Sequence, residues 1–219
     1  MLLGMVLLYV GAVLAINGIW LVGQARAAAP AAAPAGPGEP VLAGGEVGEV
    51  APTRRARRAR APEEHPAFIT NHEIAILNVF TGFVGLLAAV TLAIHGNANS
   101  DIAEIRAAAY IMLFAFTYLW VAYNQFTDVN GHAFGWYCLF VAITAVVAGI
   151  YSFVDANGND ATVYLGFDWM AWAVLWFMFF LLLSLERPIA RVTGYVAILE
   201  GIGTSWVFAI LLLQNELSF

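Results

Sequence analysis

The stretch AFGWYCLFVAITAVVAGIYSF, Ala133–Phe153, contains no charged side chain. Its apolar residues run continuously, and it is as long as the roughly 20 residues that an α-helix needs to cross a bilayer. Strands that cross membranes are only about ten residues long and alternate apolar with polar side chains. We therefore interpret this stretch as a transmembrane α-helix.

Five further stretches are long, mainly apolar runs: Leu2–Gly23, Phe68–Ile94, Ala107–Gln125, Phe167–Leu185 and Val192–Leu213. Hydrophobic residues make up 62% of the 219 residues and charged residues only 11%. A soluble domain carries about 25% charged residues, so the bilayer must be the solvent for most of this chain. The sequence predicts an all-α membrane protein whose six transmembrane helices form one bundle.

The first stretch also resembles a secretory signal peptide, because Leu2–Ile16 is followed by a small-residue segment around Arg26. Two features favour a retained helix instead. No positive charge precedes the apolar run, and Asn17 and Gly18 interrupt it before a second apolar stretch. We expect residues 1–23 to form the first transmembrane helix.

Residues 24–66 are rich in Ala, Pro and Gly and then in Arg, with RRARRAR at Arg54–Arg60. Such a segment has too little apolar surface to offset the entropy of ordering it, which predicts a disordered loop. We interpret the arginines as a solvated charge run that sets topology. A contact with anionic lipid or nucleic acid is the less favoured alternative. Residues 67–219 then hold the other five helices.

The arginines also predict which loops face the cytoplasm. Arg26 and the Arg54–Arg60 cluster lie in the first loop, Arg187 and Arg191 lie in the fifth, and only Arg106 lies in an even-numbered loop. Since positive residues favour the cytoplasmic side, loops one, three and five face inward. The prediction is a multi-pass protein of the cell membrane with both termini outside the cytoplasm.

Glu200 is the one ionisable residue that this assignment places deep within a helix. Charged side chains are costly there, so either a functional role or a hydrogen bond that fixes helix packing has to explain it. Asn17 is a possible partner. Asn17, Asn78 and Thr144 are polar residues within other helices, and such residues usually tie helices together.

Aromatic residues recur at helical spacing in the third and fifth helices. Trp172 and Trp176 are four residues apart, as are Phe114 and Tyr118, so each pair shares one face of its helix. A slot between indole and phenol rings suits a flat, neutral, polar solute, and the Tyr118 hydroxyl can hydrogen-bond to it. The same walls exclude hydrated ions. Ordinary packing is the alternative.

Enzyme chemistry finds no support in the residue pattern. His65, His72, His95 and His132 all fall in loops or at helix ends, so no intramembrane pair is available to ligate a haem. No zinc motif, phosphate-binding glycine loop or nucleophile–base arrangement is present in the sequence. We predict a protein that is not an enzyme and needs no cofactor or metal.

Several motifs resemble the AmiS/UreI family of urea and short-chain amide channels. The first is LLYVGAVLAINGIW at Leu7–Trp20, and the others follow in order along the chain: FTYLWVAYNQ (Phe116–Gln125), WYCLFVAIT (Trp136–Thr144), AWAVLW (Ala171–Trp176) and AILEGIGTSW (Ala197–Trp206). The resemblance covers nearly all of the chain outside residues 24–66.

The resemblance implies a six-helix protomer with its own pore, assembled as a homohexameric ring in membrane lipid. It implies passive flux of urea or short-chain amides that supplies a cytoplasmic urease or amidase. Independently of the resemblance, we expect no nucleic-acid partner, because the only basic cluster lies in the low-complexity loop. The resemblance places Phe114, Tyr118, Trp172, Leu175 and Trp176 on the family's narrow pore positions, and Val10 and Leu14 on apolar pore-lining positions. It also matches Glu200 to the family's glutamate in the sixth helix.

The chain departs from the family pattern in three places. The first cytoplasmic loop is longer, Thr144 stands where urea channels often have asparagine, and the fourth loop has no histidine. These departures leave the choice between urea and amide, and any acid gating, open. A proton-coupled transporter using Glu200 is the alternative function, and a membrane enzyme is a weaker one.

Overall fold

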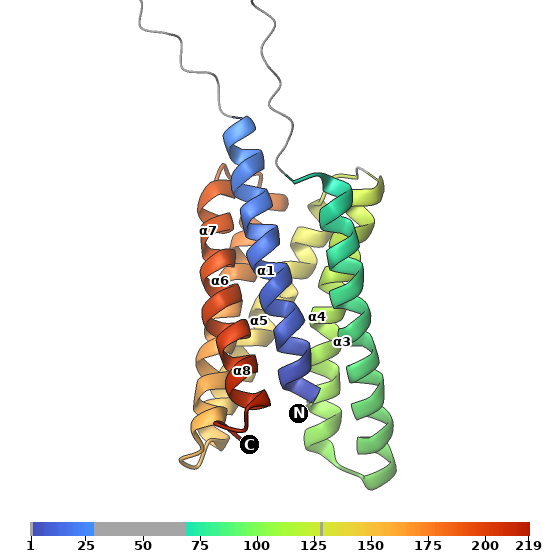
Figure 1. Ribbon diagram of the computed structural model, residues 1–219, viewed down its shortest axis with the longest axis vertical. Helices are drawn as coiled ribbons and strands as arrows, with labels where there is room; N and C mark the ends of the chain where they lie inside the picture. The colour runs from blue at the N-terminus through green and yellow to red at the C-terminus, as the bar shows by residue number, and fades with distance from the viewer. Residues whose placement is uncertain (1, 29–68, 128) are drawn as a thin grey trace, which may run out of the picture.

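The computed structural model describes residues 2–28, 69–127 and 129–219 as a helical bundle (Figure 1). It has six helices long and apolar enough to cross a membrane, and no strand occurs in the described ranges. Five are continuous, and the sixth is built of three parts: α1 Leu2–Ala27, α3 Asn71–Asn99, α4 Ile102–Thr127, α5 His132–Asp155, α6 Asp160–Leu183, then α7 Ala190–Glu200, the π-helical turn η1 Gly201–Trp206 and α8 Val207–Leu213. We call residues Ala190–Leu213 the last span. The prediction of an all-α, six-span membrane protein is confirmed.

The helices pack mainly as three pairs. α3 lies along α4, α5 lies along α6, and α1 lies along the last span, with a smaller contact between α1 and α3. Both termini lie at one end of the bundle (Figure 1). The far end carries the C-terminal end of α1 and the starts of α3, α5 and α7, so Arg26 and Arg191 lie at that same end.

One burial pattern recurs in the first turns of α3, α5 and α7. Two adjacent residues are buried, and the residue three positions after the second of them is buried again. The recurrence gives each of the three pairs a helix that turns a similar face inward. The positions are Ile74, Ala75 and Asn78 in α3, then Phe134, Gly135 and Cys138 in α5, then Thr193, Gly194 and Ala197 in α7.

Side-chain caps fix where two of the helices begin. At α3 the Thr70 hydroxyl accepts a hydrogen bond from the Glu73 backbone N–H at 3.3 Å, and the Glu73 carboxylate accepts one from the Thr70 N–H at 2.8 Å. At α6 the Asn159 side chain accepts from the Thr162 N–H at 2.8 Å. These bonds satisfy backbone donors that the first helical turn leaves unpaired.

The Asn159 cap explains a difference from the expected boundaries. The apolar pattern predicts a fifth helix from Phe167, but α6 begins at Asp160. Asp168 therefore lies about two turns inside a membrane-spanning helix rather than at its end. α1 also continues to Ala27 rather than ending at Gly23. Residues 29–66 of the expected long loop, including the Arg54–Arg60 cluster, lie outside the described residues.

Glycines let α1 and the last span approach each other closely. A Cβ atom at Gly18 would lie 2.5 Å from the Gly194 carbonyl oxygen, and one at Gly11 would lie 2.8 Å from the Trp206 backbone nitrogen. Contacts this short do not occur between a real Cβ and backbone, so any larger residue must push the helices apart. Small residues are the usual device for close packing of helices in membranes.

The Gly18 contact predicts a specific sensitivity to substitution. Gly18→Ala should destabilise the folded protein by about 1–3 kcal/mol, because the added methyl group overpacks against backbone that cannot move aside. Gly23→Ala, five residues along the same helix, is the matched control, since no atom from another part of the described chain lies within 4 Å of its Cβ position. Thermal unfolding in detergent, followed by tryptophan fluorescence, checks both. Equal midpoints for the two variants would show that the close approach is not needed.

Candidate functional site

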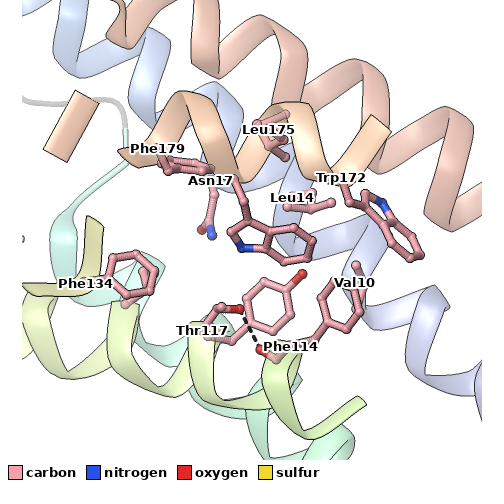
Figure 2. A pocket seen from close by; sticks show the side chains of 13 residues that line it. Val10, Leu14, Asn17, Phe114, Thr117, Phe134, Trp172, Leu175 and Phe179 are labelled. Atoms are coloured by element: carbon pink, nitrogen blue, oxygen red, sulfur yellow. Dashed lines mark hydrogen bonds between the residues drawn. The ribbon is translucent and has the colours of Figure 1, made fainter. Parts of the chain in front are cut away.

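A cavity of about 50 Å³ lies in the interior of the bundle, between α1, α4, α6 and α7 (Figure 2). That space has room for a few water molecules. Side chains from α1, α4 and α6 point toward one another around it. All of the residues predicted for the pore line it, namely Val10, Leu14, Phe114, Tyr118, Trp172, Leu175 and Trp176. They come from α1, α4 and α6, which are distant in sequence.

The cavity wall also includes residues that the sequence analysis did not assign to a pore. Phe134 from α5 and Ala197 from α7 close two sides, while Asn17 and Thr117 bring polar atoms. The Thr117 hydroxyl is already engaged, since it donates to the Phe114 carbonyl oxygen at 2.6 Å. Val121 and Phe179 complete the lining. The wall is therefore mainly apolar, with few polar groups.

Phe114 is the centre of the aromatic part of the wall. Its ring centroid lies 4.6 Å from that of Trp176, 5.1 Å from that of Trp172 and 5.3 Å from that of Trp169. These are tilted or edge-to-face arrangements, which aromatic pairs prefer over direct stacking. Each ring is thus held by its neighbours, and the cavity is bounded by rigid planar surfaces.

A chain of hydrogen bonds ties Trp172 to the last span. Its indole N–H donates to the Thr204 hydroxyl oxygen at 2.8 Å, and the Thr204 hydroxyl donates to the Glu200 carbonyl oxygen at 2.6 Å. Tyr164 of α6 donates to the Gly203 carbonyl oxygen at 2.7 Å. All three contacts are made to the end of α7 and the π-helical turn, a kind of irregularity that is frequent at functional sites.

Asn17, named above as a possible partner of Glu200, does not pair with it. Asn17 instead forms a reciprocal pair with Asn78 of α3, at 3.1 Å for the bond that Asn17 donates and 2.9 Å for the bond that Asn78 donates. The Asn78 side chain also donates to the Ile74 carbonyl oxygen at 2.8 Å. Asn78 is fully buried, so this pair joins α1 to α3 beside the cavity. Thr144 does not line the cavity and donates within its own helix, to the Phe140 carbonyl.

Two buried acids, rather than the expected one, lie in the membrane-spanning part of the bundle. Glu200 is 9% exposed and Asp168 only 2% exposed. Hydropathy places Asp168 at the edge of a helix, which is why the sequence analysis missed it. The available signal was the Asn157-Gly158-Asn159 turn, because its last residue is a good N-cap and starts α6 early.

The asparagine pair predicts a measurable coupling. Asn78→Ala should destabilise the protein by about 1 kcal/mol, since it leaves the Asn17 amide without its partner next to the cavity. In a double-mutant cycle with Asn17→Ala, the second substitution should cost less in the presence of the first. Chemical denaturation in mixed micelles measures the four proteins. Strictly additive effects would show that the two amides do not stabilise the bundle as a pair.

Comparison with known proteins bears directly on the cavity. Residues 67–216 match the family model described as AmiS/UreI family transporter. A candidate transporter of amidate substrates from Mycolicibacterium smegmatis is 40% identical over 141 residues, which are 64% of this chain and 63% of the relative. The acid-activated urea channel of Helicobacter pylori strain 26695 is 33% identical over 161 residues, covering 63% of this chain and 82% of that one.

A structural comparison extends over the whole chain. The crystal structure of the urea channel from the human gastric pathogen Helicobacter pylori superposes with a TM-score of 0.71 and 28% identity, covering 100% of both chains. The alignment to the M. smegmatis protein and that to AmiS2 of Rhodococcus erythropolis span 63% and 66% of those relatives, less than two thirds of each. The family match covers well over half of this chain. The protein belongs to the AmiS/UreI family of transporters.

Proposed function

We propose that this protein is a passive channel for urea or short-chain aliphatic amides across the cytoplasmic membrane. In this proposal each protomer carries its own pore through the cavity, and the solute supplies a cytoplasmic amidase or urease. The observation that carries it is the convergence on one interior cavity of Val10, Leu14, Phe114, Tyr118, Trp172, Leu175 and Trp176, in a chain of a transporter family.

The chemistry of the cavity suits this class of solute. A planar, uncharged amide can lie against the ring faces of Phe114 and Trp176, while the Tyr118 hydroxyl offers a hydrogen bond. A hydrated ion would have to exchange its water for an apolar wall, which is costly. Passive flux needs no coupling ion, so the same cavity can serve in both directions down the gradient.

The distribution of charged and apolar surface residues supports the proposed orientation and assembly. Arg26, Arg187 and Arg191 lie at the end of the bundle opposite the termini. Because positive residues favour the cytoplasmic side, we propose that this end faces the cytoplasm and that both termini lie outside it. Large apolar side chains such as Phe80, Trp136 and Phe167 are more than half exposed. In the membrane these faces contact lipid or neighbouring protomers, and we propose a homohexameric ring.

Proton-coupled transport is the second candidate, because Asp168 joins Glu200 as a buried acid of a membrane span. Enzymatic activity has less to support it. Among the described residues no group of three or more His, Cys, Asp or Glu could hold a metal ion. The absence of a catalytic role therefore remains a prediction of this proposal.

Facilitated diffusion is directly testable in proteoliposomes. Vesicles containing the protein should swell faster than empty vesicles in inward gradients of urea or acetamide, because the cavity replaces the desolvation barrier of the bilayer. The rate should be unchanged when a proton or sodium gradient is imposed or collapsed. Stopped-flow light scattering measures the rate, and uptake that requires either ion gradient would establish the coupled transporter instead.

The Tyr118 hydroxyl, the hydrogen-bonding group proposed for the solute, can be removed without changing the ring. Tyr118→Phe should change the rate or the urea-to-acetamide selectivity by about two- to tenfold, the range expected for one hydrogen bond. Tyr151→Phe is the matched control, since Tyr151 is 55% exposed and Tyr118 only 5%. Trp176→Ala should alter selectivity more, because it removes a wall. Wild-type flux and selectivity in both the Tyr118→Phe and Trp176→Ala variants would show that these residues only pack the bundle.

A further inference from the structure

Two carboxyl oxygens in the interior of the bundle have no hydrogen-bond partner. They are Oδ2 of Asp168 and Oε2 of Glu200, and both atoms are buried among the described residues. Buried polar atoms in folded proteins are almost always paired, so each exception needs an explanation. The ion pairs found in the described part of the chain involve other acids, so no arginine or histidine there accounts for these two.

The two acids come from different helices that meet beside Trp172. Asp168 is on α6, one turn before Trp172. Glu200 ends α7, and its backbone carbonyl accepts a hydrogen bond from the Thr204 hydroxyl that holds the Trp172 indole. Tyr118 of α4 lines the same cavity as Trp172, so its hydroxyl can donate a hydrogen bond to a solute there.

The helical register places both acids one turn beyond the cavity. Asp168 precedes Trp172 by four residues, and Glu200 follows Ala197 by three, so each shares a helix face with a residue of the cavity wall. Trp172 lines the cavity on this side and is held there by its hydrogen bond to Thr204. Both acids therefore lie one helical turn from residues of the cavity wall.

The hydrogen-bonding groups of the two acids and Tyr118 match those of a primary amide. A carboxyl oxygen accepts a hydrogen bond from an N–H group whether or not the other oxygen carries a proton, and a tyrosine hydroxyl donates to a carbonyl oxygen. A primary amide offers both a carbonyl oxygen and N–H donors. A metal cation would need more oxygen ligands than these two acids provide.

We propose that Asp168 and Glu200, with Tyr118 as donor, form an amide-recognition site that favours solutes carrying N–H groups. This inference rests on the proposed channel function. It adds Asp168 as a residue through which the channel selects solutes by hydrogen bonding as well as by size and planarity. As the solute leaves its water shell, the two carboxyl groups replace water as hydrogen-bond acceptors for its N–H groups. Passage of an N–H-bearing solute is therefore favoured over that of an N-alkylated one.

Three isomers of formula C3H7NO separate hydrogen bonding from size. Propionamide has two N–H donors, N-methylacetamide has one and N,N-dimethylformamide has none. Swelling of proteoliposomes, corrected for empty vesicles, should follow that order in the wild-type protein. Asp168→Leu should lower the propionamide-to-dimethylformamide ratio about fivefold, the effect of losing one or more hydrogen bonds. Asp155→Leu, which changes a half-exposed acid outside the cavity, should leave the ratio unchanged.

The outcomes distinguish this inference from the function on which it rests. If wild-type vesicles pass none of these solutes, nor urea or acetamide, faster than empty ones, the channel function itself fails. If the wild type conducts but shows no preference among the isomers, or if assembled Asp168→Leu keeps the preference, the recognition site is refuted and the channel stands. Should the leucine variant not assemble, Asp168→Ala carries the same expectation, because it leaves space rather than bulk.

Discussion

α1 and the last span cross so closely at Gly11 and Gly18 that backbone atoms of one helix occupy the space of a side chain on the other. This approach determines where the rest of α1 lies. It presses Val10 and Leu14 into the interior, against the aromatic face that α4 and α6 present. A wider crossing would open the cavity to lipid, so the enclosed wall depends on this contact between small residues.

The interior contains few polar groups, and they differ in whether they have hydrogen-bond partners. Asn17 and Asn78 satisfy each other, and the Trp172 indole is satisfied by Thr204. Asp168 and Glu200 each have a buried carboxyl oxygen without a hydrogen-bond partner among the described residues. Paired polar groups hold helices together, whereas unpaired ones destabilise the empty protein by the cost of their desolvation. That contrast is what distinguishes the structural polar residues from those that we assign to the solute.

The π-helical turn Gly201–Trp206 contributes both to the packing of α1 and to the hydrogen bonds of the interior. It begins directly after Glu200, provides the acceptor for Tyr164 and the hydroxyl that holds Trp172, and contains Gly201, which contacts α1. Packing of α1, the orientation of the tryptophan and the position of the acid are thus determined by one short segment. A regular helix there would rotate the residues after it and separate these contacts.

The sequence predicts the six spans because each is a continuous apolar run, a signal that survives without knowledge of the neighbours. It also predicts the aromatic wall, since the spacing of Trp172 and Trp176 and the resemblance to known channels point to the same face. It does not reveal Asp168, because hydropathy averages over the polar start of α6 and misses the Asn159 cap. The partner of Asn17 and the irregular turn after Glu200 depend on contacts between distant segments, which no local pattern contains.

If the solute passes through the cavity within each protomer, blocking that cavity must stop the flux. Leu14 lines the cavity, whereas Ala12 on the same helix is exposed on the outer face of the bundle. Leu14→Trp fills the space with an indole ring, and Ala12→Trp adds the same ring outside it. Among variants that elute with the wild-type profile, acetamide flux should be lost in Leu14→Trp and retained in Ala12→Trp. Wild-type flux through an assembled Leu14→Trp protein would show that the solute takes another route.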